Sequence, residues 1–168
     1  MKCKIISISH KPADWEKKAS DYYLKQIPSN LKLSFVEVKP AGSKSMSEED
    51  TIRNESFEIF RHLDKAAYII LWDRKGDLIS SEGLAKLFQD KIDLAENVNM
   101  IVGGAFGVSE ELKEKADLML SASQLTLPHR LFKILLMEQI YRASAINRNH
   151  PYHTVSYTHL TLPTTRCV

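Results

Sequence analysis

The sequence SASQLTLPHRLFKILLMEQIYRASAINRNHPYH, residues Ser121–His153, joins a proline-containing loop, a long apolar helix and a polar end rich in histidine. Two short segments in it carry most of the functional signal, LTLPH at Leu125–His129 and NHPYH at Asn149–His153. The helix predicted between them, over residues 130–147, is apolar over far more than the roughly 100° stripe that one core contact needs. We therefore expect a second chain against this helix, in a homodimer; burial inside one monomer is the alternative.

The basic charge of the chain is concentrated in the same stretch. The net formal charge is only +2, which does not by itself indicate a nucleic-acid binder. Residues 1–120 hold 18 lysines and arginines against 20 acidic residues, whereas residues 121–154 hold four against one, together with three of the six histidines. This distribution predicts an anionic partner at this end, either RNA or a phosphorylated ligand. A solvated helix face would explain the charge alone equally well.

Length and composition are those of an ordinary soluble protein. The 168 residues suffice for one domain with a proper core, and 43% of them are hydrophobic and 26% charged. No apolar run reaches the roughly eighteen residues of a membrane span, and the N-terminus lacks a secretory cleavage site. We therefore expect a cytoplasmic protein without membrane association. Cys3 and Cys167 lie at opposite ends without the neighbours of a metal site or redox pair, so we expect no metal.

Strands and helices alternate along the first 120 residues. The runs AYIILW at Ala67–Trp72 and VNMIV at Val98–Val102 have strand length and are apolar throughout, as is typical of central strands covered on both faces. Strands are also predicted over residues 4–9, 31–38 and 117–120, and a polar turn over 73–77. Helices are predicted over 14–27, 47–63 and 130–147, after Ser80 or Ser81, and after Ser109. The first has Trp15, Ala19, Tyr22 and Tyr23 facing inward. This order predicts a largely parallel α/β sheet with helices on both faces.

A glycine-rich segment follows the second of these apolar strands. GGAFG, at Gly103–Gly107, lets the backbone approach a ligand closely at the carboxyl end of a parallel strand. It is a poor dinucleotide fingerprint because it does not follow the first strand, and no Gly-Lys-Ser/Thr follows it as in a phosphate-binding P-loop. A glycine turn kept for tight packing is the alternative.

Two further groups of residues indicate ligand binding without naming a reaction. The loop 121–129 is too apolar to be left in water without cause, and its backbone groups suit adenine and ribose recognition, although a buried connector would look the same. His129, Arg142 and the segment 150–153 bring imidazole, guanidinium and phenol to one region. Such side chains could hold an RNA base by stacking and phosphates by arginine.

The combination of these motifs is similar to that of a known family. The chain carries GG-x-x-G after a strand, then S-x-x-T-L-P-H, then L-x-x-x-L-x-x-E-Q-I-Y-R-A-x-x-I, and finally N-H-P-Y-H. This pattern closely resembles the RlmH family, bacterial S-adenosylmethionine-dependent methyltransferases of the SPOUT superfamily that act at N3 of a pseudouridine in 23S ribosomal RNA. The likeness covers nearly all of residues 1–153, including KPADW at 11–15 and YLKQIP at 23–28.

The resemblance implies an α/β, parallel-sheet SPOUT methyltransferase fold with a C-terminal trefoil knot, in one domain over residues 1–153. It also implies a homodimer with an active site shared across the interface, and the assembled ribosome as partner. Carried over residue by residue, the S-adenosylmethionine site would comprise Trp72, Gly103, Gly104, Ala122, Ser123, Gln124, Leu125, Thr126 and Leu127. The catalytic cluster around the target base would comprise His129, Arg142, Tyr152 and His153. In it, we expect His129 or His153 to assist deprotonation, Arg142 to offset negative charge and Tyr152 to pack on the base.

The sequence departs from the family pattern in two places. Trp72 stands where the family usually has a smaller aliphatic residue. Family chains end within a residue or two of NHPYH, usually with a basic residue, whereas Thr154 stands here and fourteen residues follow it. We interpret residues 154–168 as a tail that the fold does not require. Two rival functions remain open: a ribosome-binding factor without turnover, which would not bind S-adenosylmethionine, and a nicotinamide oxidoreductase, which the position of the glycine segment disfavours.

Overall fold

Five parallel strands form one sheet, and five α-helices and a short 3₁₀ helix accompany it in the described part of the chain. The computed structural model describes residues 1–42 and 46–154, and for the last two of these the backbone alone. The strand order is β2-β1-β4-β3-β5. The strands are β1 (Lys2–Ile8), β2 (Lys32–Val38), β3 (Tyr68–Leu78), β4 (Val98–Val102) and β5 (Leu118–Ser121). The helices are α1 (Asp14–Leu24), α2 (Glu48–His62), α3 (Ser81–Asp93), α4 (Glu110–Glu114), α5 (His129–Asn147) and the 3₁₀ helix η1 (Pro151–Thr154). The predicted alternation and the parallel α/β sheet are confirmed.

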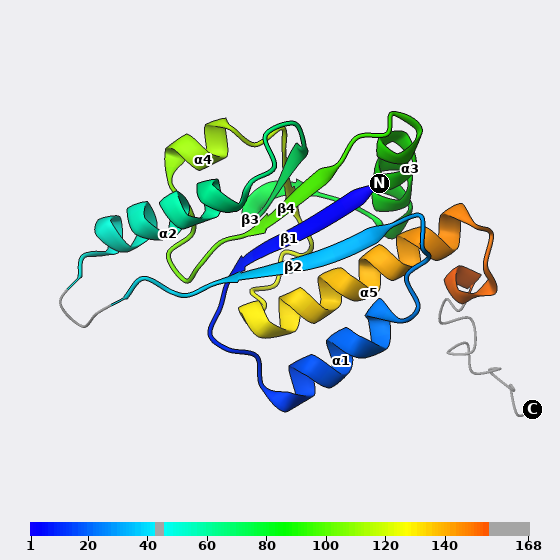
Figure 1. Cartoon of the computed structure of the whole chain (residues 1–168), viewed down its shortest axis with the longest axis horizontal. Coiled ribbons are helices and arrows are strands. Elements are labelled where there is room, and N and C mark those ends of the chain that lie inside the picture. Colours follow the sequence, from blue (N-terminus) through cyan, green and yellow to red (C-terminus); the bar gives the residue numbers. More distant parts are fainter. Residues whose placement is uncertain (43–45, 155–168) are drawn as a thin grey trace, which may run out of the picture.

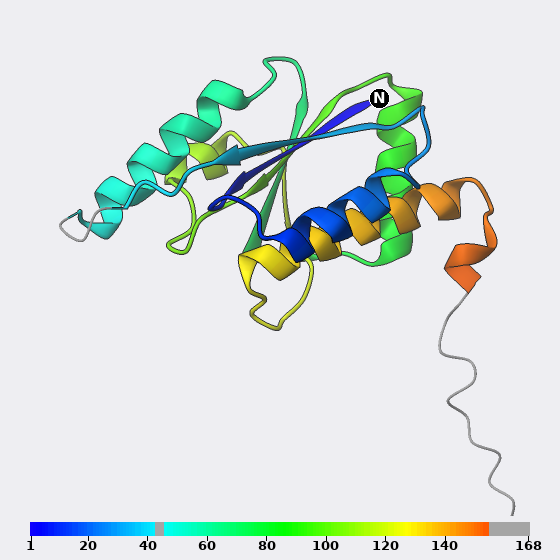
Figure 2. The ribbon, with the colours of Figure 1, turned by 60° about the horizontal axis from the view of Figure 1, so that its bottom comes forward.

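Helices cover both faces of the sheet, so that the fold has three layers (Figures 1 and 2). On one face lie α1, α3 and α5, and the buried side chains there include Ile5, Met100, Leu136 and Ile140. On the other face lie α2 and α4, over a second cluster that includes Ile6, Ile59, Ile101 and Leu112. Successive residues of β1 and β4 therefore enter different cores, which explains why these strands are apolar at nearly every position.

Three serines begin helices at the positions that the sequence indicated. The side chains of Ser47, Ser80 and Ser109 accept hydrogen bonds from the backbone N–H groups of Asp50, Gly83 and Leu112, respectively. Each bond satisfies a donor that the first helical turn leaves without a partner, and acidic residues follow at once in α2 and α4. These helix starts were predictable because capping is a local interaction.

The polar turn predicted over residues 73–77 is wrong, because β3 continues to Leu78. Trp72 and Asp77 both pair with Leu120 on β5, so residues 73–76 between them form a bulge in the β3–β5 ladder. Beyond the bulge, Leu78 pairs with Ser121. The bulge requires a glycine, since a Cβ on Gly76 would lie 2.5 Å from the carbonyl carbon of Leu120. Strand β5 is therefore held on both sides of the bulge.

The predicted inward face of α1 is wrong in part. Trp15 and Tyr22 are about half exposed or more, at 49% and 62%, whereas Glu16 is almost fully buried. The reason is an ion-pair cluster: Glu16 faces Arg130 at 3.2 Å and Lys133 at 3.8 Å on α5. The helix turns to bring this carboxylate to its partners, and it also ends at Leu24 rather than at residue 27.

Helix α5 packs against α1, α3 and the sheet within one chain. Its buried side chains include Met137, Tyr141 and Ala143 and also Lys133, whose Nζ lies 2.7 Å from an oxygen of Glu37 on β2. Leu131 is half exposed. Much of the broad apolar surface of α5 is thus covered within one chain, as expected if the helix is buried inside a monomer. A smaller part, which includes Leu131, stays exposed.

Candidate active site

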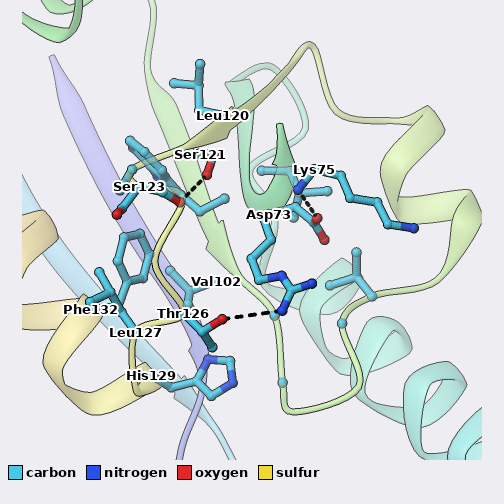
Figure 3. A pocket seen from close by; sticks show the side chains of 18 of the residues that line it. Asp73, Lys75, Val102, Leu120, Ser121, Ser123, Thr126, Leu127, His129 and Phe132 are labelled. Atoms are coloured by element: carbon cyan, nitrogen blue, oxygen red, sulfur yellow. Dashed lines mark hydrogen bonds between the residues drawn. The ribbon is translucent and has the colours of Figure 1, made fainter. Parts of the chain in front are cut away.

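A cavity lies at the carboxyl edge of the sheet, where β4 and β5 end and β3 enters its bulge (Figure 3). Its volume is about 330 Å³, and α5 closes one side with His129 and Phe132. In parallel α/β sheets, ligands bind at this edge because the loops there leave the strands together. Over the described residues, no helix is long and apolar enough to cross a membrane, and no three His, Cys, Asp or Glu side chains gather in a way that could hold a metal ion.

One wall of the cavity is the glycine turn after β4, residues 103–107. A Cβ on Gly103 would lie 2.8 Å from Cγ1 of Val108, and one on Gly104 would overlap the carboxyl group of Glu55. Gly107 has φ +87°, which side chains rarely tolerate, and its N–H donates to the carbonyl of Gly104 at 3.1 Å. Gly103 and Gly104 are therefore required by close packing behind the turn, as the alternative interpretation expected, and Gly107 by its backbone conformation, while all three line the cavity.

The opposite wall is the loop after β5, residues 121–127. Ser121 Oγ donates to the carbonyl of Ser123 at 3.1 Å, and the N–H of Leu125 donates to Ser123 Oγ at 2.9 Å. From the bulge of β3, Arg74 reaches across to Thr126 Oγ1 at 3.4 Å (Figure 3). These hydrogen bonds, two within the loop and one from β3, give a segment without regular secondary structure a defined shape. The side chain of Leu125 is 73% exposed.

Two aromatic rings belong to the apolar part of the cavity lining, together with aliphatic side chains such as those of Val102 and Leu127. The rings of Trp72 at the end of the first part of β3 and Phe132 on α5 meet edge to face, with centroids 5.7 Å apart. Trp72 is 8% exposed, and its indole Nε1 is buried with no hydrogen-bond partner among residues 1–42 and 46–154. Burying an N–H donor without a partner is unfavourable, and this nitrogen is enclosed by protein atoms although other parts of Trp72 line the cavity.

Most residues expected at the cofactor site line this cavity. They are Trp72, Gly103, Gly104, Ala122, Ser123, Leu125, Thr126 and Leu127, whereas Gln124 is exposed and is not among the lining residues. Sequence reasoning missed the segment 73–75, which also lines the cavity. A signal for it existed: residues that follow a central parallel strand lie at the same edge as the glycine turn.

The residues expected around the target base occupy two separate places. His129 borders the cavity at the start of α5. Arg142 is thirteen residues further along the same helix, which at 1.5 Å per residue puts it roughly 20 Å away. Tyr152 lies with Arg142, and the His153 side chain falls outside what the structure describes. Within one chain, the expected cluster is therefore not assembled.

Arg142 and Tyr152 are held together by Glu138. Arg142 donates to Glu138 Oε1 from Nε at 3.0 Å, its second guanidinium nitrogen lies 2.7 Å from the same oxygen, and the Tyr152 hydroxyl donates to it at 3.1 Å. The guanidinium also lies 4.9 Å from the centre of the Tyr152 ring. Burial, followed by the charge of Glu138, raises the pKa of Tyr152 to about 12, so the phenol stays protonated at neutral pH and donates to the carboxylate.

The comparisons with known proteins place the chain in a class. It belongs to the SPOUT methyltransferase family, whose model, described as predicted SPOUT methyltransferase, matches residues 1–153. It is similar to the protein named Ribosomal RNA large subunit methyltransferase H of Dechloromonas aromatica (strain RCB), with 35% identity over 153 residues that cover 91% of this chain and 98% of that protein. The protein of the same name from Burkholderia vietnamiensis is 37% identical over 154 residues, which cover 91% and 99%. The expected family is thereby confirmed.

Proposed function

We propose that this protein is a ribosomal RNA methyltransferase that transfers a methyl group from S-adenosylmethionine to N3 of a pseudouridine in 23S ribosomal RNA. The observation that carries the proposal is the cavity of about 330 Å³ that backbone segments 103–104 and 122–127 enclose at the carboxyl edge of a family member's sheet. Relatives over nearly the full length bear the name of a large-subunit ribosomal RNA methyltransferase, which supports RNA as the substrate.

The cavity fits S-adenosylmethionine in size and chemistry. Its volume falls in the range of ligand sites, at roughly 300–1,000 Å³. Trp72 and Phe132 offer an apolar surface to an adenine ring, and the loop 122–127 offers backbone donors and acceptors to its edge. Gly103 and Gly104 line the cavity without side chains that could fill it, and the space on their Cβ sides is already taken by Val108 and Glu55.

The bound cofactor would supply a methyl group that its sulfonium already activates. The protein therefore has mainly to align the acceptor nitrogen and remove its proton. His129 lies at the cavity and is our first candidate for the proton acceptor, with His153 as the second. Arg142, oriented by Glu138, would offset negative charge that develops on the base, and Tyr152 would pack on its ring.

A homodimer would complete this arrangement. His129 and Arg142 lie at opposite parts of one helix, roughly 20 Å apart, so a single chain cannot bring both to one base. If two chains pack with α5 antiparallel, the Arg142 and Tyr152 group of one chain approaches the cavity of the other. The half-exposed side chains of Leu131 on α5 and Trp15 on α1 support an interface on this side of the molecule.

The remaining expectations belong to the same proposal. Residues 1–153 form the domain, and the tail 154–168, of which the structure describes only Thr154, is not needed for activity. We include the C-terminal trefoil knot, which the family membership of the chain supports. With a net charge of only +2, the protein binds isolated RNA weakly, and the assembled ribosome in the cytoplasm supplies further recognition surface.

The decisive experiment compares ribosomal RNA from cells with and without the gene by mass spectrometry. We expect one pseudouridine of 23S RNA to lose a methyl group in the deletion strain and to regain it when the gene is restored. The same enzyme should methylate ribosomes from the deletion strain far faster than a naked RNA fragment. Unchanged modification in the deletion strain would contradict the proposed activity. Calorimetry distinguishes the rival function, because a ribosome-binding factor without turnover would show no saturable binding of S-adenosylmethionine.

A further inference from the structure

A buried carboxyl group lies directly behind the glycine wall of the cavity. Glu55, on α2, is only 4% exposed, and its Oε2 has no hydrogen-bond partner in the described ranges. The carboxyl group touches Gly104 so closely that a Cβ on this glycine would overlap Oε2 and lie 3.1 Å from the carboxyl carbon. Gly104 itself lines the cavity. One backbone segment therefore separates an acidic group from the proposed cofactor site.

This carboxyl group is fixed in place from several sides. Its other oxygen, Oε1, accepts a hydrogen bond from the N–H of Ala41 at 3.1 Å, in the connection after β2. The next residue on α2, Ser56, accepts a bond from the N–H of Ser109 at 2.9 Å, just beyond the glycine turn. Two neighbouring residues of α2 thus contact the segment 103–109, Glu55 near its start at Gly104 and Ser56 at its end at Ser109. Neither the helix nor the turn can shift without breaking these contacts.

No positive charge is paired with Glu55 in the described residues. Its two observed contacts are the N–H of Ala41 and the backbone of Gly104, neither of which titrates, and Glu55 takes part in none of the ion pairs found among these residues. Burial raises the pKa of the carboxyl group, and the bond from Ala41 opposes this only in part. The charged and titratable groups that face the cavity itself are Asp73, Arg74, Lys75 and His129. A ligand that held a positive charge at the glycine wall would therefore place it close to Glu55, in a region of low dielectric constant.

We propose that Glu55 is a positioning and selectivity residue that makes the cavity favour the positively charged S-adenosylmethionine over its neutral product, S-adenosylhomocysteine. This inference rests on the proposed function. The two ligands share the adenosine and amino-acid parts and differ in the methyl group and in the sulfonium charge, so a buried carboxylate acts on their difference. After methyl transfer the charge disappears, and the product leaves a site that no longer attracts it.

The test is isothermal calorimetry with both ligands on the wild type and on Glu55→Gln, which keeps the shape of the side chain. We expect the ratio of the two affinities to fall several-fold in the variant through weaker binding of S-adenosylmethionine. In sinefungin a carbon atom that carries a protonated amine replaces the methylated sulfur, so this ligand keeps a positive charge without a sulfonium; its binding should weaken in parallel. An unchanged ratio in Glu55→Gln would overturn the inference, while wild-type protein that binds none of the ligands would overturn the proposed function as well.

Ser56→Ala is the matched control, since it loosens the same turn without changing a charge. It should weaken both ligands by the same factor and leave their ratio as in the wild type; a ratio that falls as far as in Glu55→Gln would mean that turn geometry, not charge, sets the selectivity.

Proton release on ligand binding provides a second test, which begins with the wild type. A cation favours the ionised carboxylate, so S-adenosylmethionine should release protons on binding as pH falls toward the raised pKa of Glu55. Glu55→Gln keeps His129, and the difference between the two proteins in proton release therefore isolates Glu55; equal release would contradict the inference.

Discussion

Trp72 and Phe132 bring two aromatic rings to the lining of the candidate site. The ring of Trp72 packs edge to face on Phe132, and its Nε1 is buried without a partner among the described residues. We expected a smaller aliphatic side chain here from the family resemblance; the tryptophan gives the cavity an aromatic surface. A ligand that enters the cavity must therefore change the surroundings of this indole.

Trp72 consequently provides an optical signal for cofactor binding. The only other tryptophan, Trp15, lies on α1 and does not line the cavity. We expect saturating S-adenosylmethionine to change the fluorescence intensity of the wild type and of Trp15→Phe. The same titration of Trp72→Phe should give no change, although calorimetry still detects binding. A signal that persists in Trp72→Phe and vanishes in Trp15→Phe would place the ligand elsewhere.

At the scale of single residues, the sequence allows prediction of those site residues that directly follow the strands. Trp72, Gly103 and the loop 122–127 come directly after apolar strands, and parallel strands bring their ends to one edge. Glu55 was not predictable in this way. It lies in the middle of α2, and only the packing of that helix against a turn some fifty residues later puts its carboxyl group behind the cavity.

At the scale of elements, the contact between α1, β2 and α5 depends on charges as well as on apolar surface. The Lys133 Nζ lies 2.7 Å from Glu37 and 3.8 Å from Glu16, and the Lys133 side chain is 4% exposed. Glu16 Oε2 additionally accepts from the N–H of Ala13 at 2.7 Å, at the start of α1. One lysine on α5 therefore holds a carboxylate on each of two other elements.

Removing this lysine should destabilise the protein strongly. Lys133→Ala leaves the carboxylates of Glu16 and Glu37 near each other, and Glu16 then has only Arg130 as an ion-pair partner among the described residues. Because Arg130 remains, we expect a loss at the lower end of that for broken buried pairs, about 3 kcal/mol of the free energy of unfolding. Lys17→Ala is the matched control, because Lys17 faces exposed Asp14 at 3.8 Å and should cost at most about 0.5 kcal/mol. Urea denaturation measures both values. Equal losses in the two variants would show that the buried cluster contributes no more than a surface pair.

The same cluster explains where prediction of the elements failed. The existence and order of the elements follow from local patterns, such as serine caps and apolar runs, and were correct. The orientation of α1 was not, because apolar periodicity ignores a partner such as Lys133, more than a hundred residues away in sequence. The length of β3 failed for a similar reason: a polar segment with a glycine reads as a turn, and only pairing with β5 extends it to Leu78.

At the scale of the whole molecule, the proposed dimer makes a sharp prediction about mixed variants. His129→Ala damages the cavity side of the site, and Arg142→Ala damages the other side, so each variant alone should be nearly inactive. If the two sides come from different chains, a mixed dimer contains one intact site and one doubly damaged site. Random exchange of equal amounts should then restore about a quarter of the wild-type activity.

The control for this experiment is a mixture of either single variant with the double variant His129→Ala, Arg142→Ala. That mixture contains no intact site in any combination and should stay inactive. Light scattering checks that all proteins have the same molar mass. Absence of recovery in the first mixture, with mixed dimers demonstrably present, would show that the sites are not shared.

Helix α5 also acts as a fixed spacer, because it carries His129 at one end and leads to Tyr152 at the other. Inserting a single residue would rotate everything beyond it by about 100°, so that side chains such as Ile140 would leave the core. Inserting four residues would nearly restore the rotation but would lengthen the helix by about 6 Å. No insertion preserves both the packing face and the reach. The length of this helix is therefore constrained as tightly as its composition, and its middle should tolerate substitutions that fit the core but no change in residue number.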